Sequence, residues 1–308
     1  MNNNKSWFAV VNPASANGQT RKVWPKLYKR LVQHGVQLDY AFTSHPGEGT
    51  DITRQALKDY SQILVVGGDG TLNEVVNGFF ANQTLINPNA SLAILSHGTG
   101  GDFLRSLTQK RGIPSFLDVL KRQQVTPIDC GVVQYQAPSG ELEYRYFLNV
   151  ADVGLSGETV DRVNKRSKVL GGRLSFLIGS LMSLLSYQNK EMKCVLDGKV
   201  IVNGTTNSII VANGRYIGGG MMVAPNAELA DGVFDIVVLG DISIWKILRH
   251  FPKIYQGKHL DVPGVSFFQG KEISIISNPT AYLDTDGEHP GYTPVHISLL
   301  PQCIKLWT

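Results

Sequence analysis

The stretch Val65-Val66-Gly67-Gly68-Asp69-Gly70-Thr71-Leu72-Asn73-Glu74 places three glycines within four positions, between an apolar run and a helical pattern. Residues 63–66 predict a buried strand, and residues 72–80 predict a helix. Glycines let the backbone approach a phosphate closely, and the first amides of a helix face an anion. Asp69 adds a carboxylate, which suits a Mg²⁺ ion lying between it and phosphates. The stretch therefore predicts a nucleotide-phosphate loop at a strand-to-helix turn.

Two further loops repeat this arrangement of strand, small residues and helix. Asn12-Pro13-Ala14-Ser15-Ala16-Asn17-Gly18 follows a strand predicted at residues 7–12. Ser96-His97-Gly98-Thr99-Gly100-Gly101-Asp102 follows a strand predicted at residues 92–95. In an open α/β sheet, ligands bind beyond the carboxyl ends of the strands, which is where all three loops fall. The three loops together therefore favour a phosphate-binding site over three strand-to-helix turns without a ligand.

Each loop also has a purely structural interpretation. Asp69 or Thr71 could cap the helix that follows the first loop, and Asp102 could cap a helix beginning at Phe103. The glycine loop at residues 67–74 does not contain G-x-x-x-x-G-K-[ST], which excludes a P-loop NTPase. Asn73 stands where a dinucleotide-binding turn has its third glycine, so that fingerprint is excluded too.

The chain changes its pattern near residue 130. Residues 1–129 alternate strand and helix, which predicts an α/β domain with a Rossmann-like open parallel sheet. Residues 130–291 contain short runs rich in Val, Ile, Tyr and Phe, which predict an antiparallel β-sandwich-like domain. Helical inserts are expected at about 157–187 and 241–256. The tail, about 292–308, is expected to pack back on the first domain.

The composition is that of an ordinary globular protein. The 308 residues are 43% hydrophobic and 18% charged, and this length favours two domains over one. A net charge of +4 is too balanced for a dedicated nucleic-acid binder. Three distant cysteines predict neither a disulfide framework nor a metal site. The sequence shows no targeting segment and no apolar stretch long enough to span a bilayer, so we expect a cytoplasmic protein.

Three carboxylates near the end form a second candidate site. Asp284, Asp286 and Glu288 alternate along a predicted strand, which would place them on one face. Like charges so close together can raise the pKa of one carboxylate toward that of a useful base. The alternative is a hairpin, because Asp286-Gly287 is a favourable type I′ turn pair.

The loops, in this order, resemble those of the diacylglycerol kinase catalytic-domain superfamily. That superfamily includes bacterial soluble diacylglycerol and lipid kinases, sphingosine kinases and ceramide kinases. The chain departs from the family pattern at His97 and Gly101. The resemblance covers essentially the whole chain and is carried by residues 12–15, 67–74, 98–103, 213–220, 224–227, 230–235 and 286–288.

The resemblance implies an ATP- and Mg²⁺-dependent kinase that phosphorylates a lipid hydroxyl, such as that of diacylglycerol. Asp69 would hold Mg²⁺, Glu288 would be the general base, and Asp286 would organise metal and water. The residues implied to line the nucleotide are Asn12, Pro13, Ala14, Ser15, Ala16, Thr43, Gly67, Gly68, Asp69, Gly70, Thr71, Leu72, Asn73 and Thr99. A second, structural Mg²⁺ site is implied at Glu228, Asp231 and Val233.

Two rival functions share parts of this pattern. An NAD kinase has the same glycine-Asp loop. A non-catalytic lipid-binding protein could keep the same fold, but binding alone would not need the carboxylates of Asp69 and Glu288.

Two amphipathic segments bear on the partners of the protein. Basic residues at 165–173 precede an apolar run at 174–185, and residues 244–253 mix Ile, Trp and Leu with Lys and Arg. Basic residues beside an apolar helix suit peripheral contact with an anionic membrane surface. The alternatives are a helix packed on the β domain or a homodimer contact.

Overall fold

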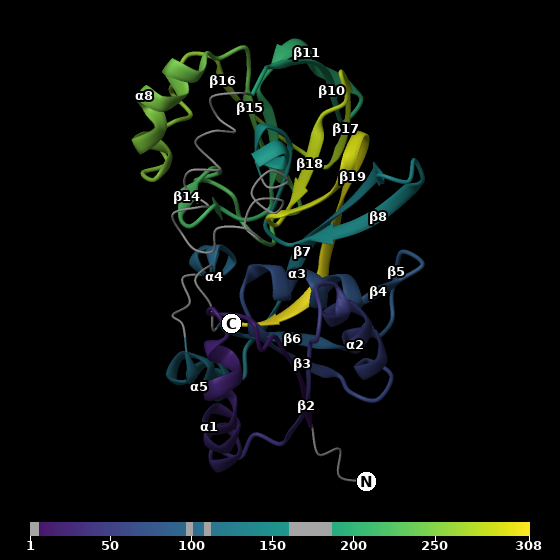
Figure 1. The fold of residues 1–308 in the computed structure, drawn as a ribbon, viewed down its shortest axis with the longest axis vertical. Helices are drawn as coiled ribbons and strands as arrows, with labels where there is room; N and C mark the ends of the chain where they lie inside the picture. Colours follow the sequence, from purple (N-terminus) through teal and green to yellow (C-terminus); the bar gives the residue numbers. More distant parts are fainter. Residues whose placement is uncertain (1–5, 97–100, 108–111, 160–186) are drawn as a thin grey trace. The chain divides into compact units, whose positions relative to one another are not determined.

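The computed structural model describes residues 6–96, 101–107, 112–159 and 187–308 (Figure 1). The chain divides into two compact units, which we call unit 1 (residues 1–130 and 301–308) and unit 2 (residues 131–300). Within the described residues, no helix is both long and apolar enough to cross a bilayer.

Unit 1 is built on a parallel sheet. Its strands lie in the order β19-β6-β3-β1-β2, and all four ladders between them are parallel. The strands are β1 (Trp7–Val11), β2 (Leu38–Phe42), β3 (Gln62–Gly67), β6 (Ser91–Ser96) and the end of β19 (Glu288–Trp307), beside a small hairpin of β4 (Phe80–Ala81) and β5 (Thr84–Leu85). The helices are α1 (Gln19–Gln33), α2 (Glu48–Ala56), α3 (Asp69–Gly78), α4 (Asp102–Ser106) and α5 (Ile113–Arg122).

Helices cover both faces of this sheet, as Figure 1 shows. Successive strand residues point to opposite faces, and every residue of β3 and β6 is buried. On one face, Trp24 of α1 and Phe116 of α5 pack against alternate strand residues such as Leu64. Burying each such side chain contributes about 1.5–3 kcal/mol. The other face contacts α2 and α3. The expected Rossmann-like parallel sheet is confirmed.

Unit 2 is antiparallel. One series of ladders runs β16-β15-β12-β9-β18-β19, and a second runs β11-β10-β17-β19. The strands are β7 (Val125–Gln136), β8 (Leu142–Phe147), β9 (Val150–Gly154), β10 (Lys190–Leu196), β11 (Lys199–Thr206), β12 (Ser208–Ala212), β13 (Tyr216–Ile217), β14 (Met221–Met222), β15 (Phe234–Leu239), β16 (Val265–Gly270), β17 (Glu272–Asn278) and β18 (Tyr282–Thr285), with helix α8 (Ile244–Ile254).

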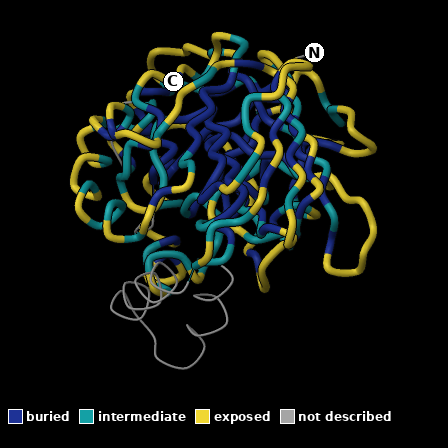
Figure 2. The backbone as a smooth tube through the Cα atoms, turned by 90° about the horizontal axis from the view of Figure 1, so that it is seen from above, coloured by how far each residue is buried: buried dark blue, intermediate teal, exposed yellow. Residues whose placement is uncertain are grey.

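Side chains from both series of strands share one core. Cys194 and Ile275 of the second series lie in the same buried cluster as Val153, Ile209 and Ile236 of the first. Two layers that meet in this way form the expected sandwich-like domain. Figure 2 shows the buried residues in dark blue and the exposed residues in yellow, with the buried ones gathered toward the inside of the trace.

Of the two helical inserts expected in this domain, the second is present as α8. The first, at about 157–187, lies largely in residues 160–186, outside the described residues.

Phe147 tests the packing of unit 2. Its ring stacks on Phe234 with centroids 5.7 Å apart, and it fills the space where a side chain at Gly131 would lie. We expect Phe147→Ala to lower the free energy of unfolding by about 3–5 kcal/mol in urea denaturation followed by circular dichroism. Leu142→Ala on the same strand is the control, because Leu142 is 61% exposed and should change that free energy by less than about 0.5 kcal/mol. Equal losses in both variants would contradict this account of the core.

Candidate functional site

The loops predicted to bind phosphate begin at one edge of the unit 1 sheet. The parallel ladders continue one residue past the strands: the Asn12 amide donates to the Val66 carbonyl, and the Thr43 amide donates to the Val11 carbonyl, each at 2.9 Å. Because the strands are parallel and in register, the segments after β1, β2, β3 and β6 start side by side. This edge is where an α/β sheet takes its ligands.

The start of α3 leaves backbone donors available there. Gly68 is extended, with φ −106° and ψ −167°, and the helix begins at the next residue. Its first turn closes when the Leu72 amide donates to the Gly68 carbonyl at 3.0 Å. The amides of Asp69, Gly70 and Thr71 therefore have no role in the helical ladder. A Cβ at Gly68 would meet no atom within 4 Å, so the space before these amides is open, as an anion site requires.

Asp69 joins two of the loops. One of its carboxylate oxygens, Oδ2, accepts hydrogen bonds from the amides of Gly101 (2.6 Å) and Asp102 (3.1 Å). The N-cap position of α3 is Gly68 and that of α4 is Gly101, and these glycines have no side chain with which to cap their own helices. The alternative in which Asp69 or Asp102 is an N-cap is therefore wrong.

Asn12 and Thr71 join the loop after β1 to the glycine loop after β3. The Asn12 Nδ2 donates to Thr71 Oγ1 at 3.0 Å, and the Asn12 Oδ1 accepts from the Ala14 amide at 2.9 Å. Thr71 is buried and occupies the space that a side chain at Gly67 would need. Thr71 therefore positions the loops and is not the N-cap of α3. Ser15 stabilises the same loop after β1, because its hydroxyl donates to the Asn12 carbonyl at 2.9 Å.

Among the described residues, further predicted nucleotide contacts lie in the same region. Thr43 is buried at the end of β2, and Leu72 and Asn73 are buried in the first turns of α3. Ala16 has a left-handed φ of 54° in the loop after β1. Thr99, together with His97, lies outside the described residues.

Glu74 is an organising residue that sequence reasoning placed in the motif without assigning it a role. Its Oε1 accepts from the Gly47 amide at 2.8 Å and its Oε2 from the Gly49 amide at 3.0 Å. The Thr50 hydroxyl donates to the Glu74 carbonyl at 2.9 Å. Glu74 thus holds the start of α2, and the loop after β2, against α3. Its partners lie 24 to 27 residues away, so no local pattern identifies them.

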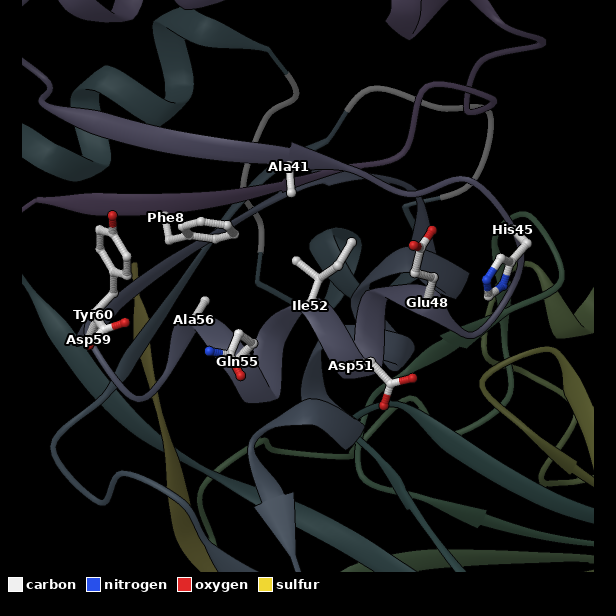
Figure 3. A pocket seen from close by; sticks show the side chains of 10 residues that line it. All are labelled: Phe8, Ala41, His45, Glu48, Asp51, Ile52, Gln55, Ala56, Asp59 and Tyr60. Carbon is white, nitrogen blue, oxygen red and sulfur yellow. The ribbon is translucent and has the colours of Figure 1, made fainter.

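A separate groove opens between α2 and the strands β1 and β2 (Figure 3). Its volume is about 510 Å³, and its walls include Phe8 and Ile52. Three carboxylates, Glu48, Asp51 and Asp59, also line it, whereas no Lys or Arg does. Like charge makes this groove unsuited to a triphosphate.

In unit 2, the three carboxylates expected on one strand lie on a hairpin instead. Thr285 of β18 pairs with Glu288 of β19, and the loop between them is Asp286-Gly287, with φ 52° and 90°. Two left-handed residues make this the type I′ turn that the alternative interpretation named. The prediction of alternation along a single strand is wrong, because the chain reverses direction between Asp284 and Glu288.

Asp286 holds this hairpin in place. Its Oδ1 accepts from the amides of Asn149 and Val150, each at 3.0 Å, and its Oδ2 accepts from the amide of Leu148 at 3.1 Å. Its own amide donates to the Val150 carbonyl at 2.9 Å. Three backbone donors make Asp286 a structural anchor for the turn that leads into Glu288, which is exposed.

Asp284 faces Asp152 across the β18–β9 ladder. Asp152 is buried, and desolvation raises its pKa to about 6, while hydrogen bonds from Ser156 and Ser208 oppose the rise. The Ser208 hydroxyl donates to Asp152 Oδ1 at 2.7 Å. Desolvation also raises the pKa of Asp284 well above its usual value, and the carboxylate of Asp152 raises it further. Both carboxyl groups are therefore easier to protonate than an exposed aspartate.

Sequence reasoning missed Asp152 as a partner of Asp284. The available signal was a single carboxylate inside the apolar strand sequence Asn149-Val150-Ala151-Asp152-Val153-Gly154. A buried carboxylate in such a strand requires a partner or a proton.

The segment expected to hold a second Mg²⁺ forms a turn. Asp231 Oδ1 accepts from the Val233 amide at 3.2 Å, and Gly232 adopts a φ of 77°. Desolvation raises the pKa of the buried Asp235, and the charges of Asp231 and Glu228 contribute to the rise. Among the described residues, no three His, Cys, Asp or Glu side chains gather closely enough to bind a metal by themselves. A cation here would depend on backbone carbonyls as well as on Asp231, which is the arrangement the resemblance implies.

Comparisons with known proteins agree over nearly the whole chain. Residues 6–133 match the diacylglycerol kinase catalytic domain family, and residues 149–308 match the YegS C-terminal NAD kinase beta sandwich-like domain family. A diacylglycerol kinase of Bacillus subtilis (strain 168) is 27% identical over 292 residues, which cover 92% of this chain and 90% of that protein.

Solved structures show the same fold. The crystal structure of a diacylglycerol kinase from Bacillus anthracis superposes with a TM-score of 0.72 at 22% identity, covering 100% of this chain and 98% of the other. An NAD kinase from Archaeoglobus fulgidus in complex with ATP has a TM-score of 0.51 at 13% identity, covering 98% of this chain and 93% of the other. The NAD kinase likeness concerns the fold alone.

The buried Asp152 yields a prediction about stability and pH. When folding raises the pKa of an acid, the group does not change the free energy of unfolding at a pH below its pKa in the unfolded chain. The free energy of unfolding then falls as the pH rises through the pKa in the folded protein, which is about 6 for Asp152. Asparagine has the same size and can still accept the Ser208 hydroxyl. We expect Asp152→Asn to raise the free energy of unfolding by about 1–3 kcal/mol at pH 8 and much less at pH 4.

Urea denaturation at both pH values measures this difference. Asp261→Asn, at an exposed position, is the control and should change neither value. If the wild type and Asp152→Asn showed the same dependence on pH, the raised pKa of Asp152 would be refuted.

Proposed function

Because the chain belongs to the diacylglycerol kinase catalytic-domain family, whose members are lipid kinases that phosphorylate an alcohol group, we propose that it transfers the γ-phosphate of ATP to the hydroxyl of diacylglycerol and releases phosphatidic acid. The observation that supports this most directly is the open start of α3. Three backbone amides and the carboxylate of Asp69 meet there, at the edge of a parallel sheet. Diacylglycerol is proposed as the acceptor because the Bacillus subtilis relative is named for it.

The nucleotide contacts are proposed from the loops at that edge. The amides of Gly70 and Thr71 donate to phosphate oxygens, and Gly68 leaves room for the phosphate to approach. Asn12 to Ala16, Thr43, Asn73 and Thr99 line the rest of the nucleotide. Transfer of a phosphoryl group depends mainly on positioning and on neutralising charge.

The residues fit the Mg²⁺ that such a reaction uses. Asp69 Oδ2 is held by two amides, so the carboxylate is fixed in orientation. Its other oxygen, Oδ1, would serve as a ligand, directly or through water. Mg²⁺ bound there would reduce the repulsion between the phosphates and an attacking hydroxyl. Glu228, Asp231 and the carbonyl of Val233 would hold a second, structural Mg²⁺.

The acceptor proton is assigned to Glu288. This carboxylate is exposed and directly follows a two-residue turn, so its position is fixed and a substrate can reach it. Asp286 acts as its positioning residue through the three amides of residues 148–150. A base within hydrogen-bonding reach of the acceptor hydroxyl increases the rate by about 10²–10⁴-fold. We further propose that the protein is cytoplasmic and meets its lipid at the membrane surface.

Substitution of the two carboxylates tests these roles. We expect Asp69→Asn and Glu288→Gln each to lower kcat by about 100-fold or more, because one removes a fixed charge beside the phosphates and the other removes the base. Turnover is measured as transfer of ³²P from labelled ATP to dioctanoylglycerol in detergent micelles.

Matched controls separate these roles from effects on folding. Asp118→Asn and Glu141→Gln make the same chemical changes at exposed positions and should retain wild-type turnover. All four variants should keep the wild-type unfolding midpoint within a few degrees. Full activity of Glu288→Gln would remove this residue as the base.

A panel of acceptors decides the substrate. Labelled ATP is offered with diacylglycerol, a sphingoid base, a polyprenol, phosphatidylglycerol and NAD in parallel. We expect phosphorylated diacylglycerol as the main product. Phosphorylation of NAD alone would replace the proposal with an NAD kinase, and ATP binding without any product would favour a non-catalytic lipid-binding protein.

A further inference from the structure

Helix α8 of unit 2 is amphipathic, yet none of its eleven residues is buried. Trp245 is 74% exposed, and Phe251 and Tyr255 are 37% and 47% exposed. The apolar side of a helix in a globular protein normally packs against the core. Large aromatic side chains left in contact with water on one short helix therefore indicate an interaction surface.

The same helix and the turn after it are basic. Lys246, Arg249, Lys253 and Lys258 lie between residues 244 and 260, a span that contains no Asp or Glu. At 3.6 residues per turn, Trp245, Arg249 and Lys253 follow one another along the exposed side. The pKa of His250, on the same helix, is lowered first by desolvation and then by the three cations Lys253, Arg249 and Lys246.

The fold holds α8 at both ends. Ile242, just before the helix, is buried, and Ile254 packs against a buried cluster that contains Val223. After the helix, the buried ring of His259 is hydrogen-bonded through Nε2 to the Val223 carbonyl at 2.9 Å. Figure 1 shows α8 at the periphery of unit 2. The aromatic and basic side chains are thus presented on a fixed support.

We propose that α8 is the surface by which unit 2 lies on an anionic lipid bilayer. Its rings enter the boundary between headgroups and acyl chains, and its cations contact lipid phosphates. Charge decides against a symmetric contact with a second copy of this chain, because such a contact would oppose two sets of four cations. An acidic protein partner would complement the positive charge of α8, but it would not account for the exposed Trp245. Tryptophan is a side chain typical of membrane interfaces. The choice of a bilayer rests on the proposed lipid acceptor.

Tryptophan fluorescence reports directly on this surface. Trp7 and Trp24 are buried and Trp307 is half-buried, so Trp245 is the tryptophan most open to a change of solvent. With vesicles of phosphatidylglycerol and phosphatidylcholine, free of diacylglycerol and nucleotide, we expect a blue shift of the emission. With phosphatidylcholine alone we expect no shift, and Trp245→Phe should abolish the shift while largely retaining binding.

Cosedimentation with the same vesicles measures the contribution of charge. Each cation near an anionic surface strengthens binding about fivefold, so the triple variant Lys246→Gln, Arg249→Gln, Lys253→Gln should lower the partition coefficient about 100-fold at low salt. Trp245→Ala should lower it on the order of tenfold. The controls are Lys199→Gln and Val200→Ala, which remove an exposed charge and an exposed apolar side chain on β11 and should change little.

The two proposals fail separately. Loss of vesicle binding in the triple variant, with unchanged turnover of dioctanoylglycerol in micelles, supports the membrane role of α8. Vesicle binding through α8 by a protein that phosphorylates no lipid overturns the proposed function and leaves this inference standing. Equal vesicle binding by wild type and triple variant overturns the inference. So does a blue shift that depends on protein concentration without vesicles, which would indicate a contact between copies.

Discussion

The parallel register of β1, β2, β3 and β6 is the constraint on which the candidate phosphate site depends. Parallel strands in register end together, so the segments that follow them share one edge. Each of these segments then needs hydrogen-bond partners for backbone groups that have left the sheet. Asp69, Asn12 and Glu74 supply those partners across the edge, and the amides at the start of α3 are the donors left over for a ligand.

Three carboxylates in this protein hold backbone segments in place. Asp286 accepts from three successive amides, Glu74 accepts from two, and Asp69 also accepts from two. Charge-assisted bonds of this kind are strong and hold loops in one geometry. The residues beside them, Glu288, Gly68 and Gly70, thereby gain fixed positions without being buried. The proposed kinase chemistry relies on that division between anchoring and reacting groups.

Local patterns predicted much of the fold and of the first site. The apolar run at residues 63–66, the glycines after it and the helical pattern beyond gave β3, its turn and α3 in the correct order. Two of the interpretations that the sequence left open are wrong, because they depended on neighbours in space. Asp69 has the residue type of an N-cap, but its oxygen is taken by amides 32 and 33 residues away. Asp284, Asp286 and Glu288 have strand spacing, but the Asp286-Gly287 pair folds as a turn once β18 and β19 can pair.

The sequence by itself determined the strands and helices around the glycine loops, the change to a β-rich pattern near residue 130 and the family that the motifs resemble, because periodicity and turn preference act over a few residues. Only the tertiary structure decided that Asp152 faces Asp284, that Glu74 holds the start of α2, and that α8 keeps its aromatic side chains in water. These features join residues many positions apart or depend on what covers a surface. Desolvation and charge depend on distances in space, and the order of residues along the chain does not specify those distances.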